Sequence, residues 1–172
     1  MLAKFRFIGL GGHGISLMGN ILGRAFAIYE ELNAVQSTFY SAAVRGGLVW
    51  SDVIAGDEEL YDIAVDYPDY FVVTSKKAIT KNMPLIKNSK ITLIKDEKNI
   101  TRLNENNVVY IDTMKTVREH NLPEYMWNIF LLGYISRLSN IIHCESLEKS
   151  ILDLITKNSD ENIRALKIGY SK

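Results

Sequence analysis

A short apolar segment that runs directly into a glycine-rich turn constrains the fold of this chain more than any other feature. Residues 5–8 have the apolar character of a buried strand, and residues 9–14 read Gly-Leu-Gly-Gly-His-Gly. Residues 15–29 follow with the composition of a helix that has few breakers. A strand, a tight glycine turn and a helix form the first half of a βαβ nucleotide-binding unit. The start of the chain therefore predicts an α/β fold.

Three glycines of this turn satisfy the G-x-G-x-x-G spacing in its proper context, after a strand and before a helix. Gly9 is expected to adopt a backbone conformation that other residues avoid, and Gly11 to let a ligand touch the main chain. Gly14 is expected to let the helix pack closely on the strand. Because a helix start offers unpaired N–H groups and a positive dipole end, the turn predicts a phosphate site.

The end of the expected second strand disfavours a nicotinamide cofactor. Such a site uses an acidic residue at that position, about 20 residues after the turn, to bind the ribose hydroxyl. The expected second strand, residues 35–40, ends in Ser-Ala-Ala, and Glu30 and Glu31 come earlier, at the end of the helix.

A second glycine element, Arg45-Gly46-Gly47, precedes the next strand. The glycines free the backbone, and the arginine carries a fork of donors suited to a carboxylate or phosphate. The alternative interpretation is a tight turn with a solvated arginine. His13 has three open interpretations: a local turn residue, an interface contact or a ligand contact. Cys144 is expected to be a small buried side chain.

Composition narrows the function classes. Twenty basic and twenty acidic residues cancel, which gives no electrostatic case for nucleic acid or a membrane surface. No apolar run approaches the length of a bilayer span, and the first residues do not resemble a signal peptide. One cysteine makes no internal disulfide and holds no iron–sulfur cluster alone. His and Cys pairs at metal-ligand spacing are absent from the sequence, so we expect a cytoplasmic protein with no metal site.

The remaining pattern alternates strands and helices and then becomes helical. We expect a single domain over residues 1–172, with an open, twisted, mainly parallel sheet, a Rossmann-like start, helices on both faces and a helical C-terminal part. Further strands are expected at residues 48–54, 70–74, 90–94 and 107–111. Ligands of open α/β sheets bind beyond the carboxyl ends of the strands. The predicted crevice is therefore lined by Gly11, Gly12, His13 and Arg45.

Residues 124–138 are expected to form a helix that is apolar on all sides. Such a helix is either deeply buried or an interface helix. The near-continuous apolar stretch from 125 to 135 predicts a partner surface, through which the isolated chain can form a homodimer.

Two motifs together resemble a known protein family. Residues 39–47 read Phe-Tyr-Ser-Ala-Ala-Val-Arg-Gly-Gly and lead into a strand with Ser51-Asp52. With the turn at 9–14, this arrangement is similar to the gamma subunit of the 2-oxoacid:ferredoxin oxidoreductases, where a Gly-x-Gly-Gly-Gln-Gly turn precedes Tyr-Gly-Pro-Glu-x-Arg-Gly-Gly. The similarity continues in residues 128–133, 146–151 and 162–170. His13 stands where the family has glutamine, and Ser41-Ala42-Ala43 replaces Gly-Pro-Glu.

The resemblance implies a subunit of a larger enzyme that oxidatively decarboxylates a 2-oxoacid such as pyruvate, 2-oxoisovalerate, 2-oxoglutarate or indolepyruvate. That enzyme forms an acyl-CoA and reduces ferredoxin. The resemblance implies alpha, beta and delta-type partner subunits, with thiamine diphosphate on the alpha and beta parts and iron–sulfur clusters on cysteine-rich parts. This chain is then inactive alone, carries no catalytic residue, and contributes to assembly or to the coenzyme A site. The implied binding residues are Gly9, Gly11, Gly12, His13, Gly14, Arg45, Gly46 and Gly47.

Two other functions stay open from the residues. The first is a free-standing Rossmann-like protein that binds a nucleotide or phosphate and has no redox activity. The second is a non-catalytic scaffold that associates through the apolar helix around Trp127 and leaves the glycine turn empty.

Overall fold

The computed structural model describes residues 1–42, 46–96, 100 and 102–172. Arg45 lies outside these described residues. The strands are β1 (Leu2–Leu10), β2 (Asn33–Tyr40), β3 (Leu48–Gly56), β4 (Tyr70–Val73), β5 (Ile91–Lys95) and β6 (Val108–Ile111). The helices are α1 (Ile15–Arg24), α2 (Lys76–Lys81), α3 (Met83–Asn88), α4 (Thr113–Glu119), α5 (Trp127–Ser139), α6 (Cys144–Leu154) and α7 (Ser159–Tyr170). A π-helical turn, Ala25–Tyr29, extends α1, and a 3₁₀ turn, Glu124–Met126, precedes α5. In the described part of the chain, no helix is long and apolar enough to cross a bilayer.

The six strands form one mixed sheet in the order β2-β3-β1-β4-β5-β6. β1, β4, β5 and β6 pair in parallel, whereas β3 is antiparallel to both β1 and β2. The expected mainly parallel sheet is confirmed, but β2 does not lie beside β1 as in a simple βαβ unit. A short connection returns the chain from β2 into β3, and such a connection joins antiparallel neighbours. β3 therefore takes the place beside β1, from Leu2 opposite Gly56 to Leu10 opposite Leu48.

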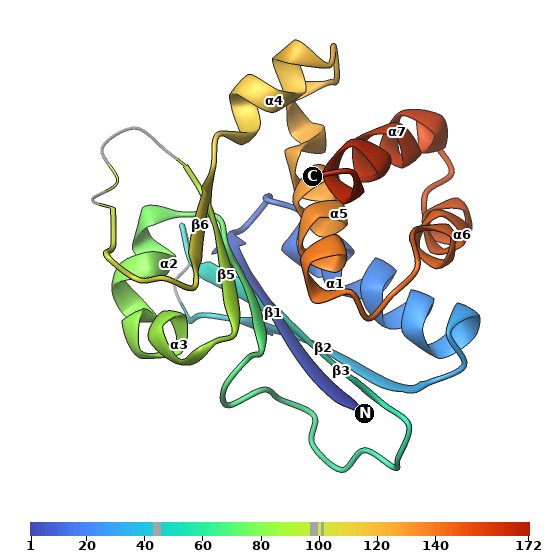
Figure 1. Cartoon of the computed structure of the whole chain (residues 1–172), viewed down its shortest axis with the longest axis horizontal. Helices are drawn as coiled ribbons and strands as arrows, with labels where there is room; N and C mark the ends of the chain where they lie inside the picture. Colours follow the sequence, from blue (N-terminus) through green and yellow to red (C-terminus); the bar gives the residue numbers. More distant parts are fainter. Residues whose placement is uncertain (43–45, 97–99, 101) are drawn as a thin grey trace.

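Helices cover both faces of the sheet, as expected (Figure 1). Alternate side chains of a strand point to opposite faces, so β1 contributes to two cores. Phe5 and Phe7 are fully buried in the core that holds α1, α5, α6 and α7. Ile8 lies in the second core with Phe71 and Ile79, on the side of α2 and α3. This layering sets the carboxyl ends of β1, β4, β5 and β6 along one rim.

The apolar helix α5 is buried by its own chain, which contradicts the predicted partner surface at residues 125–135. Its buried residues include Ile129, Phe130, Leu131, Leu132 and Ile135. The inner side contacts β4, β5 and α1, and α7 lies on the other side (Figure 1). An all-round apolar helix fits either burial or an interface, and its sequence alone does not reveal that α7 packs over it.

Candidate functional site

The glycine turn at the end of β1 exposes main chain at the start of α1. Gly12 has φ +87° and Gly14 has φ +70°, the left-handed region that glycine enters without strain. Gly11 and Gly12 are exposed, and a Cβ atom at either position would have no atom of the described residues within 4 Å. The main chain at these two positions is therefore open to close approach, as the spacing predicts.

Two positions of the turn, Gly9 and Gly14, require glycine for reasons that differ from those expected from the sequence. Gly9 lies within β1, opposite Val49, and has no left-handed conformation. A Cβ atom at Gly9 would lie 2.0 Å from Oγ1 of Thr74, so close approach excludes a side chain there. Gly14 supplies the unusual φ, and its Cβ would lie 2.1 Å from Nδ2 of Asn128 in α5. Gly14 thus allows close packing against Asn128 of α5. The spacing had predicted close packing of α1 on β1 instead.

The second glycine element meets the first one. The Gly11 N–H donates a hydrogen bond to the carbonyl of Gly47 at 3.4 Å. Nearby, Nζ of Lys77 donates to the carbonyl of Gly46 at 2.7 Å. The structure therefore brings Gly46 and Gly47 to the same rim as the turn at 9–14, while Arg45 stays a prediction.

His13, which follows β1, contacts the residue after β4 and the first residue of α5. Its Nδ1 lies 3.1 Å from Oγ1 of Thr74, directly after β4. Because the Thr74 hydroxyl donates its one hydrogen to the Ile8 carbonyl at 3.1 Å, His13 Nδ1 is the donor to Thr74. The imidazole meets Trp127 edge-on, with ring centroids 5.3 Å apart, and Nζ of Lys95 lies 4.9 Å from the Trp127 ring centroid. His13 is thus held at this rim by Thr74 and Trp127, and it is not among the residues that line the two hollows described next.

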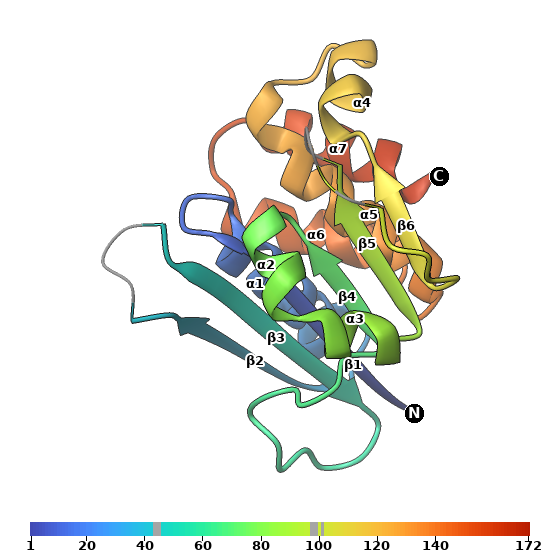
Figure 2. The ribbon, with the colours of Figure 1, turned by 90° about the vertical axis from the view of Figure 1, so that its left-hand side faces the viewer.

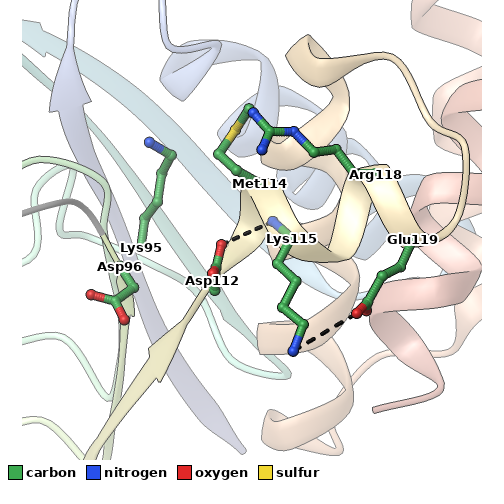
Figure 3. Close-up of a pocket in the computed structure, with 7 residues that line it drawn as sticks. All are labelled: Lys95, Asp96, Asp112, Met114, Lys115, Arg118 and Glu119. Carbon is green, nitrogen blue, oxygen red and sulfur yellow. Dashed lines mark hydrogen bonds and ion pairs between the residues drawn. The ribbon is translucent and has the colours of Figure 1, made fainter.

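Two hollows open on this rim. The smaller, of about 360 Å³, lies against the glycine turn, the first residues of α1 and Tyr40. The larger, of about 760 Å³, lies beyond β5 and β6 (Figure 3). Its lining residues are Lys95, Asp96, Asp112, Met114, Lys115, Arg118 and Glu119. The sequence patterns did not indicate Thr74, Lys95 or Trp127, although the first two occupy strand-end positions that topology brings to the rim.

The charges of the larger hollow are largely compensated within the chain. Asp112 caps α4 by accepting a hydrogen bond from the Lys115 N–H at 2.9 Å, and Lys115 Nζ lies 3.8 Å from Glu119 (Figure 3). Arg118 pairs with Glu124 at 3.2 Å. A compensated, open hollow is suited to holding a polar ligand, and it offers no activated nucleophile.

Outside this rim, the described residues offer no activated thiol and no set of metal ligands. Burial, followed by the neighbouring Glu148 carboxylate, raises the pKa of the Cys144 thiol to about 11. This half-buried thiol stays protonated at neutral pH, so it is a poor nucleophile. In the parts of the chain that the structure describes, no group of three or more His, Cys, Asp or Glu residues is arranged to hold a metal ion.

The chain is similar to known proteins over nearly its whole length. Residues 4–172 match the family model described as pyruvate ferredoxin/flavodoxin oxidoreductase. The chain is 37% identical over 175 residues to the 2-oxoglutarate synthase subunit KorC of Methanocaldococcus jannaschii, covering 99% of this chain and 93% of that protein.

Solved structures share the fold. The gamma subunit of a keto/oxoacid ferredoxin oxidoreductase from Geobacter sulfurreducens superposes with a TM-score of 0.82 at 26% identity, covering 98% of this chain and 96% of the other. The 2-oxoglutarate:ferredoxin oxidoreductase of Magnetococcus marinus, solved with 2-oxoglutarate, coenzyme A and succinyl-CoA bound, superposes with a TM-score of 0.85 at 24% identity. The match covers 99% of this chain but 30% of the Magnetococcus chain, so there the same fold is one part of a longer polypeptide.

Proposed function

The chain belongs to the pyruvate ferredoxin/flavodoxin oxidoreductase family as a gamma subunit of a 2-oxoacid:ferredoxin oxidoreductase complex, and we propose that its 2-oxoacid is 2-oxoglutarate. The observation that carries the choice of substrate is the 37% identity to a 2-oxoglutarate synthase subunit across nearly the full length of both chains.

The proposed complex converts a 2-oxoacid and coenzyme A into an acyl-CoA and carbon dioxide, with transfer of electrons to ferredoxin. The family resemblance implies that thiamine diphosphate lies on alpha and beta-type companions and the iron–sulfur clusters on cysteine-rich companions. Clusters are held mainly by sets of cysteines, and this chain has one cysteine. The contribution of this chain is assembly and binding, and we expect the isolated subunit to be inactive.

The glycine turn is the part of this chain best suited to coenzyme A, which supplies the thiol that accepts the acyl group. Gly11 and Gly12 leave space around their main chain, and the start of α1 directs N–H groups to the adjoining hollow of about 360 Å³. Exposed main chain beside a helix start suits a phosphate. Gly46, Gly47 and the predicted anion partner Arg45 complete the proposed site, while Gly9, His13 and Gly14 shape it by packing.

Assembly and substrate choice are tested together by affinity purification of the tagged chain from its native extract. The companions should include thiamine- and cluster-bearing chains, and the purified assembly should reduce ferredoxin faster with 2-oxoglutarate than with pyruvate. The chain alone should give no turnover. Turnover by the isolated chain, or a complex that prefers pyruvate, would contradict the proposal.

The coenzyme A site is tested by Gly11→Val in the assembled complex. A Cβ atom at Gly11 would have no atom of the described residues within 4 Å, so we expect the fold to tolerate valine while ligand access to the main chain is narrowed. We expect the KM for coenzyme A to rise by about tenfold or more, equivalent to about 1.4 kcal/mol, with the KM for 2-oxoglutarate unchanged. Asn20→Val, on the exposed side of α1, is the control. Equal KM values for coenzyme A in the two variants would argue against a site at the turn.

A further inference from the structure

The far face of the sheet is covered unevenly. α2 and α3 lie over one part of it, whereas β2 and β3 extend beyond these helices (Figure 2). The connection between β3 and β4, residues 57–69, loops beyond the ends of these strands and then returns against the uncovered part (Figure 2), where Ile63 is hydrogen-bonded to Ser37 and Val65 to Asp52. We call this connection the acidic strap. Six of the chain's 20 acidic residues lie in it, together with none of the lysines, arginines or histidines. Its acidic residues are Asp57, Glu58, Glu59, Asp62, Asp66 and Asp69. Three of them pair within the chain: Asp57 with the N-terminal ammonium group, Asp62 with Lys4 at 3.8 Å and Asp69 with Lys90 at 3.0 Å. Glu58, Glu59 and Asp66 are exposed, and they carry the negative charge that the strap offers to a partner.

A buried ion pair holds the acidic strap against the sheet. Nε of Arg6 lies 2.6 Å from Oδ1 of Asp52, whose side chain is 1% exposed. Oδ2 of Asp52 accepts a hydrogen bond from the Val65 N–H at 2.9 Å, and the Arg6 guanidinium donates to the Val65 carbonyl. Both main-chain groups of Val65 are thus bound, so the strap presents its other side chains in a defined place.

A groove of about 440 Å³ lies between the strap and α2. Its floor includes Phe39 and Trp50, a cross-strand pair whose rings stack with centroids 5.5 Å apart and an interplanar angle of 16°. Ser41 also lines the groove, and its buried hydroxyl oxygen has no hydrogen-bond partner among the described residues. Beside the groove, the strap leaves Ile63 68% exposed and Tyr67 62% exposed.

We propose that a companion subunit of the complex docks on this surface, through a segment that carries lysine or arginine next to an apolar anchor. The apolar anchor enters the groove over Phe39 and Trp50, and the basic groups face the acidic strap. Interfaces place aromatic residues at the core and polar residues at the rim, and complementary charge guides association. This inference rests on the proposed function, because it requires a companion chain.

Charge argues against a second copy of this chain as the occupant. A two-fold contact would place the same patch on both partners and bring one acidic strap against the other. Like charges opposed across an interface are unfavourable. A basic segment that lies along Glu58, Glu59 and Asp66 meets no such repulsion, and Lys81 on the α2 side of the groove confines it to the side of the strap. The long chain from Magnetococcus, in which this fold is joined to further polypeptide, shows that such a fold can adjoin other parts of an oxidoreductase.

The test measures the affinity of the purified full-length chain for the companion assembly, prepared by co-expression without this chain. Glu58→Lys/Asp66→Lys reverses two exposed charges of the strap, and Ile63→Ser removes an exposed apolar side chain. Each should weaken the Kd by about tenfold or more, and the charge reversal should also reduce the dependence of the Kd on salt. Activity at saturating subunit concentration should be unchanged.

The matched control is Asp160→Lys/Glu161→Lys, which makes the same charge change on the exposed start of α7. It should leave the Kd within about threefold of the wild-type value, as expected for charges outside an interface. Urea unfolding checks that all variants are folded. Wild-type-like affinity of the folded strap variants would overturn the docking surface alone. Failure of the wild-type chain to bind any companion would instead reject the proposed function, and a strap-dependent dimer of the isolated chain would identify a second copy as the occupant.

Discussion

Gly11 and Gly14 lie three residues apart in the turn after β1, yet their surroundings place opposite demands on them. Gly14 has a left-handed backbone and faces Asn128, whereas a Cβ atom at Gly11 would have no atom of the described residues within 4 Å. Backbone conformation and packing therefore both disfavour a side chain at Gly14. In the proposed site, the space at Gly11 is used by the ligand, so the same residue type meets a packing demand at one position and a binding demand at the other.

Gly14→Ala should consequently destabilise the protein far more than Gly11→Ala. A left-handed backbone costs a non-glycine residue about 1–2 kcal/mol, and the new methyl group must also displace Asn128. We expect a total loss of about 2–3 kcal/mol for Gly14→Ala, the range for overpacked sites, measured by urea unfolding. Gly11→Ala should stay within about 0.5 kcal/mol of wild type, as for other surface substitutions. Equal losses would show that the turn relaxes around both positions.

A titratable pair connects the π-helical end of α1 with α6. The His143 N–H donates to Oε1 of Glu30 at 2.9 Å, and its Nδ1 lies 3.0 Å from Oε2. The Glu30 carboxylate raises the pKa of His143 above its ordinary 6.5. Burial alone would raise the pKa of Glu30, but hydrogen bonds from Ser146 and from the His143 main chain and ring lower it below its ordinary 4.5.

These shifts give a pH dependence with a definite sign. The His143 contribution is complete below pH 6.5, the pKa in the unfolded chain, and is lost as the pH rises through the higher folded pKa. The Glu30 contribution is present above pH 4.5 and is lost as the pH falls through the lower folded pKa. The thermal midpoint of wild type should therefore fall from about pH 6 to pH 8 more than that of Glu30→Gln. Glu31→Gln, at the exposed neighbour, should retain the wild-type slope, and parallel slopes in all three proteins would exclude the pair as the cause.

At the level of elements, two glycines allow α5 and α7 to pack closely where they cross. A Cβ atom at Gly133 would lie 2.2 Å from the Leu166 carbonyl oxygen, and one at Gly169 would lie 2.0 Å from the Phe130 carbonyl oxygen. Each helix thus approaches the main chain of the other. This close contact lets α7 cover the outward side of α5.

Gly133→Ala should be destabilising although alanine favours helices. Alanine gains about 1 kcal/mol in helix propensity, but the obstacle is backbone of α7 and cannot rotate away. Because the obstacle is main chain, overpacking should cost about 3 kcal/mol, the upper end of the usual range, and leave a net loss of about 2 kcal/mol in urea unfolding. Asn20→Ala on the exposed face of α1 should instead stabilise the protein by a few tenths of a kcal/mol, about 0.5 at most. A stabilised Gly133→Ala would mean that the two helices separate at little cost.

The positions of helices and strands along the sequence were largely predictable from local patterns. Which elements pack against one another in the fold was not. Periodicity and turn residues located the six strands and most helices, because strand formation and capping depend on nearby residues; Ser75, for example, caps α2 through the Ala78 N–H. The insertion of β3 beside β1 and the burial of α5 depend on contacts distant in the chain. For the same reason the glycine turn was recognisable, while Thr74, Lys95 and Trp127 came to light only from the assembled rim.

At the scale of the whole molecule, the sheet has buried central strands and two edge strands. β1, β4 and β5 lie inside the sheet and are covered by helices on both faces, whereas β2 and β6 are its edge strands. An edge strand leaves half of its main-chain groups without partners in the sheet. The isolated subunit should therefore be least protected at the margins.

Amide hydrogen exchange should reveal this gradient. In the isolated chain, amides of β4 and β5 should exchange only through global unfolding, and those of β2 at least about tenfold faster through local opening. The measurement is peptide-resolved deuterium uptake at neutral pH. Uniform protection across β2, β4 and β5 would show that the sheet opens as a single unit.

Arg6 and Asp52 bind Val65 through its main-chain carbonyl and N–H groups. These hydrogen bonds do not depend on the side chains before and after Val65, so substitutions there can change the surface without changing the path of the main chain. If the acidic strap is the docking surface, the side chains that contact the companion can change while the path of the main chain at Val65 stays the same.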